Sequence, residues 1–261
     1  MADIFRGVWV VAYRELLRFI SERSRLFSSF AMPLIFLVVF GAGFGQLISF
    51  TGVDYMQFMY PGIIAMTVLM GSIMSGVSIV WDREFGFLKE ILVSPLGRSG
   101  IMLGKATGAA AVAILQATIM LVLAPILGVS INLVMVLELI LVILIVSISL
   151  AGMGLLVASR MQSQQGFQVI IQLIIMPLIF LAGVFYPVNN VPVWMEVISK
   201  VNPLTYGVDA IRQIFLGSEG AATIGVTVFG HTMTVWQDVL VVASFGSILL
   251  ILAIWSFSRQ E

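Results

Sequence analysis

The sequence contains no cysteine, one histidine and few charged residues. Lys and Arg number 13, as do Asp and Glu, and together they are 10% of the 261 residues. The absence of cysteine excludes a disulfide-stapled secreted module, and one histidine leaves little with which to build a zinc or haem site. Because the charges balance, no basic surplus is left for nucleic acid, and we expect no nucleic-acid partner.

Apolar residues take the place of the missing charges. They make up 60% of the chain, and the mean hydropathy is +1.12. A soluble fold of this length could not bury so many apolar side chains, because much of its surface faces water. The sequence therefore predicts an all-α polytopic membrane protein. A spanning β-barrel would show short alternating segments instead of continuous apolar runs.

The spans are predicted from six stretches without any charged residue. These stretches are 26–53, 55–81, 106–137, 139–159, 161–195 and 239–258. Each reaches the roughly 20 residues that a helix needs to cross about 30 Å of hydrocarbon. We expect six transmembrane helices, the fifth near 167–186, with both termini on one side.

The orientation follows from the distribution of Lys and Arg. With the N-terminus inside, the cytoplasmic pieces are 1–25, 82–105, 159–166 and 259–261. They hold 11 of the 13 basic residues, and only Lys200 and Arg212 fall outside. Basic residues gather on the cytoplasmic side of membrane proteins, which predicts that both termini are cytoplasmic.

Two segments are apolar without looking like simple spans. In residues 1–25, several apolar residues recur at the spacing of one helix face, namely Ile4, Val8, Val11, Ala12, Leu16 and Phe19. This pattern favours an N-terminal interfacial amphipathic helix in the inner headgroup layer, with a plain cytoplasmic extension as the alternative. In residues 187–236, charges and prolines interrupt the apolar residues, which predicts short re-entrant helices before the last span, followed by an exposed loop or hairpin at 217–236.

The sequence offers no convincing energy source of its own. Residues 99–106 approach a P-loop, but Ser99 stands where glycine is needed and Ala106 where Ser or Thr is needed. Glu138 falls near the outer start of a span, which favours an interfacial carboxylate over a proton relay. We expect no catalytic residue, no metal and no cofactor bound by this chain, so that a partner supplies the energy.

The loop at 82–98 holds a second amphipathic pattern. Phe85, Leu88, Ile91 and Leu92 share one helical face, and Ser94-Pro95 ends the helix. Three acids, Asp82, Glu84 and Glu90, alternate with Arg83 and Lys89, which favours a solvated charged face over a metal cluster. A short helix of this kind either rests on lipid or docks in a groove of a cytosolic partner.

This loop resembles the signature of the ABC type-2 exporter permeases, and three further stretches agree. They are 55–63 (YMQFMYPGI), 177–187 (PLIFLAGVFYP) and 202–206 (NPLTY) with Ile211-Arg212 after it. The resemblance covers essentially the whole chain and implies one permease domain over 1–261. It implies a coupling helix that docks on an ATPase subunit, formed by Arg83, Glu84, Phe85, Gly86, Phe87, Leu88, Lys89, Glu90 and Ile91.

The resemblance also implies partners, location and cargo. Two copies of a P-loop nucleotide-binding ATPase subunit would hold ATP and Mg, and a second copy of the permease would complete the exporter, most simply as a homodimer. The assembly would sit in the plasma (inner) membrane of a prokaryote and export amphipathic drugs, lipids or lipid-linked saccharides. A non-transporting membrane scaffold or a passive channel is the alternative function.

Two further sets of residues each allow two interpretations of equal weight, one functional and one structural. Gln162 and Gln164 lie in a short polar turn, which is either a second ATPase contact or a plain loop. An aromatic stripe, with two later phenylalanines, is either a substrate path or a lipid-facing surface. It consists of Phe36, Phe40 and Phe44, joined by Phe180 and Phe185.

Overall fold

The computed structural model describes residues 2–45, 49–50, 53–86, 97–127, 131–221, 224–228 and 230–259, and these are almost entirely helical. The α-helices are α1 (Ala2–Ser21), α2 (Arg23–Phe44), α3 (Tyr55–Met74), α4 (Val77–Glu84), α6 (Arg98–Leu123), α7 (Leu133–Arg160), α8 (Gln164–Phe180), α9 (Val193–Val201), α10 (Pro203–Ala221) and α11 (Val235–Ser258). Short 3-10 turns follow α6 and α8, at η1 (Ala124–Leu127) and η2 (Val188–Asn190). Two antiparallel strand pairs complete the fold: β1 (Ser49–Phe50) with β2 (Val53–Asp54), and β3 (Thr227–Val228) with β4 (His231–Thr232).

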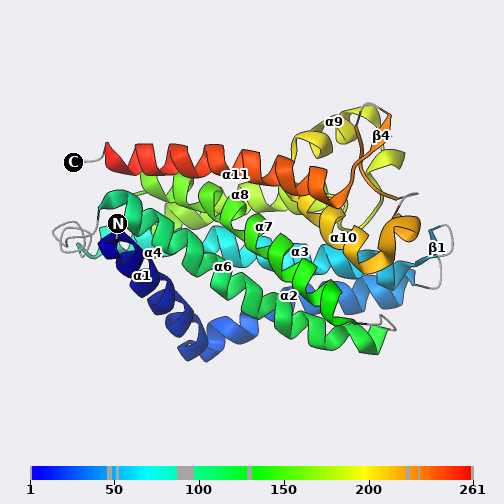
Figure 1. The fold of residues 1–261 in the computed structure, drawn as a ribbon, viewed down its shortest axis with the longest axis horizontal. Helices are drawn as coiled ribbons and strands as arrows, with labels where there is room; N and C mark the ends of the chain where they lie inside the picture. The colour runs from blue at the N-terminus through cyan, green and yellow to red at the C-terminus, as the bar shows by residue number, and fades with distance from the viewer. Residues whose placement is uncertain are drawn as a thin grey trace.

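The long helices form an elongated bundle with two distinct ends (Figure 1). Both chain termini lie at one end, which we call the termini end, and α1 crosses the bundle obliquely there. The opposite end carries β1, β4, α9 and α10, and we call it the hairpin end. An all-α membrane protein is therefore confirmed as the fold class.

Helix α3 is the centre of the bundle. It contacts α2, α6, α7 and α10, and its side chains Phe58, Ile63 and Leu69 are fully buried. The outer helices expose apolar side chains instead, including Phe27 on α2 and Ile251 on α11, which are 74% and 65% exposed. A soluble domain does not expose apolar surface on this scale, whereas lipid or a second subunit covers it at no cost in hydration.

Side-chain caps explain where several helices begin. Asp54 accepts a hydrogen bond from the Met56 N–H at the start of α3, and Asn132 accepts one from Met135 N–H at the start of α7. Thr234 and Gln237 form a reciprocal capping box on α11. Each cap satisfies backbone donors that the helix itself leaves without partners.

Close helix contact depends on small residues where the α3–α4 pair crosses α7. A Cβ atom on Gly154 would lie 2.2 Å from the Ile73 carbonyl oxygen, and one on Gly76 would lie 2.5 Å from the Gly154 carbonyl oxygen. Neither distance is tolerable for a real side chain, so these glycines let the two backbones touch. Small residues at helix crossings are typical of packing in membranes.

Five helices in the described ranges are long and apolar enough to cross a membrane: α2, α3 continued into α4, α6, α7 and α11. The helix expected over 167–186 is different, because α8 begins at Gln164 and ends at Phe180, giving 17 residues. Ser163 caps its start, and Gly183, with φ of +74°, turns the chain beyond its end. Two side chains satisfy its last carbonyls: Tyr186 donates to Phe180 O and Asn202 to Leu178 O.

On helix α1, the apolar face that was expected to lie against lipid headgroups packs against protein. Val11 and Ala12 pack against α6, where a Cβ on Gly104 would lie 2.7 Å from Val11 Cβ. A second apolar set faces outward on α1, namely Trp9, Val10, Tyr13, Leu17 and Ile20, which are 45–70% exposed. The helix is thus apolar on two sides, and the side that the periodicity singled out lies on protein.

Candidate functional site

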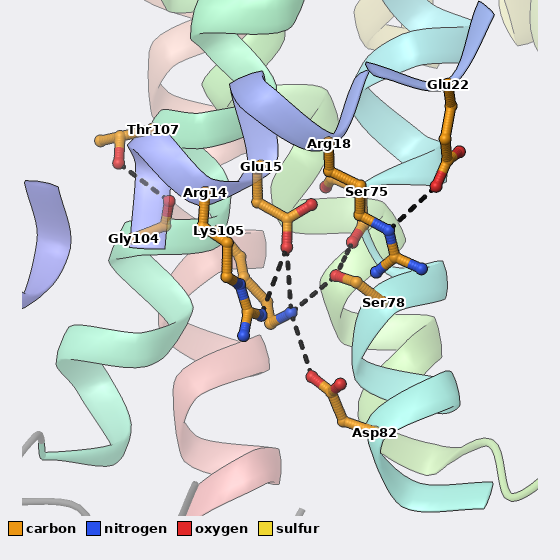
Figure 2. Close-up of polar contacts among 10 residues, drawn as sticks. All are labelled: Arg14, Glu15, Arg18, Glu22, Ser75, Ser78, Asp82, Gly104, Lys105 and Thr107. Atoms are coloured by element: carbon orange, nitrogen blue, oxygen red, sulfur yellow. Dashed lines mark hydrogen bonds and ion pairs between the residues drawn. The ribbon is translucent and has the colours of Figure 1, made fainter. Parts of the chain in front are cut away.

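The termini end contains a buried lysine held by three helices (Figure 2). Lys105, on α6, is 2% exposed, and its Nζ lies 2.6 Å from Ser78 Oγ on α4. The same nitrogen lies 3.4 Å from Glu15 Oε1 on α1 and 3.5 Å from Asp82 Oδ2 on α4. A buried ammonium is costly unless it is paired and hydrogen-bonded, and here it has both kinds of partner. The cluster fastens α1 to α4 and α6.

Small residues on α6 make this cluster possible. A Cβ on Gly108 would lie 3.0 Å from Glu15 Cβ and 3.2 Å from Ala12 Cα. Together with Gly104, this glycine leaves a shallow groove in which α1 lies close enough for Glu15 to reach Lys105. The segment 99–106, considered above as a possible P-loop, is the beginning of this helix.

The acids at the end of α4 have separate structural partners. Asp82 is 16% exposed and faces Lys105, so the expectation of a solvated charged face is wrong for this residue. Glu84 Oε2 accepts a hydrogen bond of 2.9 Å from the Gln164 backbone N–H, at the start of α8. A carboxylate at a helix N-terminus is stabilised by the helix dipole. Glu90 lies outside the described residues.

Arg83 ties the end of α4 to the end of α7. Its Nη1 donates to the carbonyls of Ser159 at 3.1 Å and Met161 at 2.5 Å, and it lies 3.4 Å from Ala158 O. These are carbonyls that the last turn of α7 cannot satisfy internally. Arg83 and Glu84 therefore link α4 to both sides of the turn that holds Gln162 and Gln164, so the structure brings the two expected ATPase contacts together.

The expected coupling helix begins differently from the sequence prediction. Arg83 and Glu84 are the last residues of α4, Phe85 caps it, and Gly86 has φ of +79°, which ends the helix. Phe85 is 63% exposed, with its ring 5.8 Å from that of Trp81. The other residues expected here, Phe87, Leu88, Lys89, Glu90 and Ile91, lie outside the described residues.

The five phenylalanines of the expected path form one cluster nearer the hairpin end. Ring centroids are 5.6 Å apart for Phe36 and Phe40, 5.7 Å for Phe40 and Phe44, and 5.0 Å for Phe40 and Phe185. Phe180 joins through Phe185 at 5.5 Å. Phe185 is buried, whereas Phe44 and Phe180 are about 40% exposed. The rings pack α2 against the segment after α8, as aromatic pairs at these distances do in protein interiors.

A polar network at the hairpin end was missed by sequence reasoning, which treated its residues as interruptions. Arg212 on α10 is 1% exposed, and its guanidinium donates to Gly183 O at 2.7 Å and Phe58 O at 3.3 Å, while lying 4.0 Å from the centroid of the Phe58 ring. Burial lowers the pKa of Arg212 to about 10, so it stays charged at neutral pH. The spacing of Asp209, Arg212 and Gln213 on one helical face is the signal that could have indicated it.

Asp209 and Gln213 extend this network to the last helix and the hairpin. Asp209 Oδ2 accepts from the Val226 N–H and from Gln213 Nε2, both at 3.0 Å. Gln213 also donates to Asp238 Oδ2 on α11 at 2.9 Å. The network fixes the segments that cover this end of the bundle.

Comparison with known proteins identifies the class to which this architecture belongs. Residues 6–216 match the ABC-2 type transporter family, and the chain belongs to that family. It is therefore a transmembrane transport permease. The region outside this match includes α11, which completes the bundle in the structure.

Several relatives carry permease names. The chain is 37% identical over 170 residues to an Escherichia coli (strain K12) protein named "Probable multidrug ABC transporter permease YbhR", covering 62% of this chain and 45% of that protein. It is 29% identical over 198 residues to ycf38 of Cyanophora paradoxa, a transport permease by its name, covering 73% and 67%. It is 30% identical over 196 residues to "Nodulation protein J" of Rhizobium meliloti (strain 1021), covering 74% of each.

Proposed function

We propose that this chain is the membrane subunit of an ATP-driven exporter. Two copies of a separate P-loop ATPase subunit would bind ATP and Mg, and two copies of this chain would enclose the path. Membership of the ABC-2 type transporter family supports transport as the activity. We propose in addition that a separate ATPase drives the transport, that the cargo moves outward, and that the permease is a homodimer.

The topology proposed is six crossings with both termini in the cytoplasm of a prokaryote, with α8 as the fifth crossing in addition to the five long helices. Its 17 residues lie at the lower limit for a spanning helix. The position of both termini at one end of the bundle supports an even number of crossings (Figure 1). The concentration of Lys and Arg at that end supports a cytoplasmic location, and the Escherichia and Rhizobium relatives support a bacterial plasma membrane.

The observation that carries the proposal is the junction of α4, α7 and α8 at the termini end. Phe85 projects from the end of α4, and the two preceding residues bind the end of α7 and the start of α8. An ATPase that pushes on Phe85 and the residues after it would thereby act on three helices at once. We propose the segment 83–91 as the docking site, with the turn at Gln162 and Gln164 beside it.

The cargo proposed is an amphipathic drug, lipid or lipid-linked saccharide. The multidrug name of the YbhR relative supports the first of these. The aromatic cluster around Phe185 would supply a surface for apolar parts of the cargo if α2 and the segment after α8 separate during transport.

The test compares two exposed phenylalanines. Phe85→Ala should reduce co-purification of the ATPase, and its lipid- or drug-stimulated turnover, because truncating an interface anchor typically weakens binding by roughly 30-fold. Phe27→Ala, on the outer face of α2, is the matched control and should leave both unchanged. Glu84 is unsuitable for this purpose, because its carboxylate is bound to α8.

Either of two results would contradict the proposal. Unchanged coupling in Phe85→Ala would remove the docking assignment. Failure of the wild-type chain to associate with any co-expressed ATPase would favour the membrane scaffold or passive channel.

A further inference from the structure

The polar network at the hairpin end contains two buried carboxyl groups that lie close together. Asp209 on α10 and Asp238 in the first turn of α11 are both 0% exposed. Both accept a hydrogen bond from one donor group, the Gln213 side-chain amide, at 3.0 and 2.9 Å. The two carboxyl groups are also within hydrogen-bond reach of each other. Two ionised carboxylates this close in a protein interior repel each other strongly, so the arrangement requires a group that lowers their charge.

The remaining oxygens of the pair restrict what this group can be. Asp209 Oδ1 and Asp238 Oδ1 have no hydrogen-bond partner among the described residues, and no water molecule has room to reach them. A metal ion needs about four to eight ligands, and the described part of the chain contains no group of three or more acids, histidines or cysteines that could hold one. A proton needs no space, and a protonated carboxyl group supplies the missing donor.

The charges of the network balance when the pair holds one proton. Arg212, on the next turn of α10, is 1% exposed and is within electrostatic range of Asp209. One ionised carboxylate neutralises this cation. Two ionised carboxylates would leave a net negative charge in the interior, and two protonated ones a net positive charge. Either imbalance is costly where water cannot solvate it.

The surroundings assign the negative charge to Asp209 and the proton to Asp238. Asp209 has the electrostatic attraction of Arg212 and a second donor, the Val226 N–H at 3.0 Å, and both stabilise its ionised form. Asp238 accepts only from Gln213 among the described donors. The N-terminal end of α11 favours a negative charge on Asp238, but a helix dipole contributes less than a buried cation and a hydrogen bond to a charged group.

We propose that Asp209 and Asp238 form a binding site for one proton, and that this proton holds α10, α11 and the segment at Val226 together. Asp238 donates the proton to Asp209. Separation of these elements exposes both carboxyl groups to water, where an ordinary aspartate is ionised at neutral pH. Opening of the hairpin end therefore releases the proton to water, and closing takes one up. The site requires neither ATP nor an ATPase.

The other titratable groups of the neighbouring elements leave this site undisturbed. Tyr206 on α10 is within electrostatic range of Asp238, and burial raises the pKa of its phenol, so that it stays neutral. The remaining groups are exposed, paired with each other, or phenols that donate to backbone carbonyls. They are Asp54, Glu138 and His231 in the first class, Glu196 and Lys200 in the second, and Tyr55, Tyr60 and Tyr186 in the third.

The experiment compares denaturant unfolding of the purified wild-type chain and of Asp238→Asn at a series of pH values. Above the ordinary aspartate pKa of about 4, the unfolded wild-type chain has released the proton that the folded chain keeps, so stability falls as the pH rises. In Asp238→Asn, the amide donates to Asp209 at every pH and no proton is bound. Between about pH 5 and pH 8, we expect the folding equilibrium constant of the wild type to fall relative to that of the variant by about 10-fold per pH unit.

Two further variants complete the comparison. Glu138→Gln removes an exposed carboxyl group on α7 and is the matched control, whose stability should follow the wild type at every pH. Asp209→Asn serves if Asp238→Asn folds poorly, and it should also lose the pH dependence, with lower stability throughout because Arg212 then faces no anion on α10. His231 titrates in this range in all of these proteins, so its contribution cancels.

Infrared spectroscopy gives a second reading that does not depend on unfolding. A protonated carboxyl group has a C=O stretching band that a carboxylate lacks, and the band shifts in D₂O. In a detergent without ester carbonyls, we expect this band in the wild type at neutral pH. It should be retained in Glu138→Gln and lost in Asp238→Asn.

Three results would overturn the proposal. Parallel pH profiles of the wild type and Asp238→Asn would show that the pair binds no proton. Absence of the infrared band from the wild type at neutral pH would show that both carboxyl groups are ionised. A stability difference that follows the concentration of Na⁺ or K⁺ instead of the pH would show that the pair holds a metal ion.

Discussion

At the scale of single residues, Lys105 stands out because its partners are also buried. Glu15 and Lys105 have side chains 9% and 2% exposed. Removing one member of such a group leaves the opposite charges in a medium of low polarity, whereas removing all members together leaves no charge to compensate. The two kinds of variant should therefore behave differently.

Lys105→Met should destabilise the protein by about 3–5 kcal/mol, since it leaves Asp82 without its cation and Glu15 with only the exposed Arg14, 3.8 Å away. The triple variant Lys105→Met, Glu15→Gln, Asp82→Asn should recover most of this loss. Thermal unfolding of the purified protein, followed by intrinsic fluorescence, gives the comparison. A triple variant no more stable than the single one would show that the cluster does not act as a unit.

Arg212 offers a test of geometry at constant charge. Arg212→Lys retains the cation but loses the planar fork that reaches both Gly183 O and Phe58 O. We expect a loss of about 1–3 kcal/mol, the cost of leaving a buried acceptor unsatisfied. Arg6→Lys, at an exposed position, should have no effect. Equal unfolding midpoints for the two variants would contradict the role given to the Arg212 hydrogen bonds.

At the scale of elements, the docking of α1 depends on the groove in α6. Gly108→Val should force the two helices apart, because even a Cβ at this position comes within 3.2 Å of the α1 backbone. The chain contains no natural cysteine, so Val11→Cys can report on the contact through its rate of reaction with a maleimide. We expect this rate to rise in Gly108→Val.

The control for this experiment lies on α2. A Cβ on Gly43 meets no atom within 4 Å, so Gly43→Val should leave the labelling of Cys at position 11 unchanged. Equal labelling in all three backgrounds would mean that α1 is not held by the groove.

The elements also show how far the sequence alone could lead. Charge-free stretches predicted the helices at 139–159 and 239–258, which α7 and α11 match within a few residues, because a bundle in lipid needs no polar face, and the gap between charges then approximates the helix. The same reasoning extended α8 to residue 186, since the helix ends through a glycine turn and two side-chain bonds rather than through a charge.

The candidate site could be predicted only in part. The motif at 83–91 predicts a docking segment, and this assignment stays a prediction. The pairing of Lys105 with Glu15 joins residues 90 positions apart, which no local pattern reveals. Helical periodicity located an apolar face on α1, but it could not tell whether that face would meet protein or lipid, and the exposed set around Trp9 is the other one. Arg212 looked like an interruption because its acceptors are carbonyls from distant segments.

At the scale of the whole molecule, the proposed orientation makes the two ends of the bundle chemically distinguishable in intact cells. Phe85→Cys at the termini end should resist a membrane-impermeant maleimide, and Trp194→Cys at the hairpin end should react. Both parent side chains are more than 60% exposed, so access is decided by the membrane. In cells that lack the ATPase, both should react after the membrane is permeabilised, and the reverse pattern in intact cells would invert the topology.

The contact between α1 and α6 also has a consequence for biosynthesis. Glu15 leaves the ribosome 90 residues before Lys105, an interval of roughly 5–20 s at ordinary rates of synthesis. Throughout that interval the side of α1 that packs on α6 is without its protein partner, while the first spans are already entering the bilayer. The nascent helix must therefore wait at the membrane surface, and it reaches its final position only when the third span has arrived.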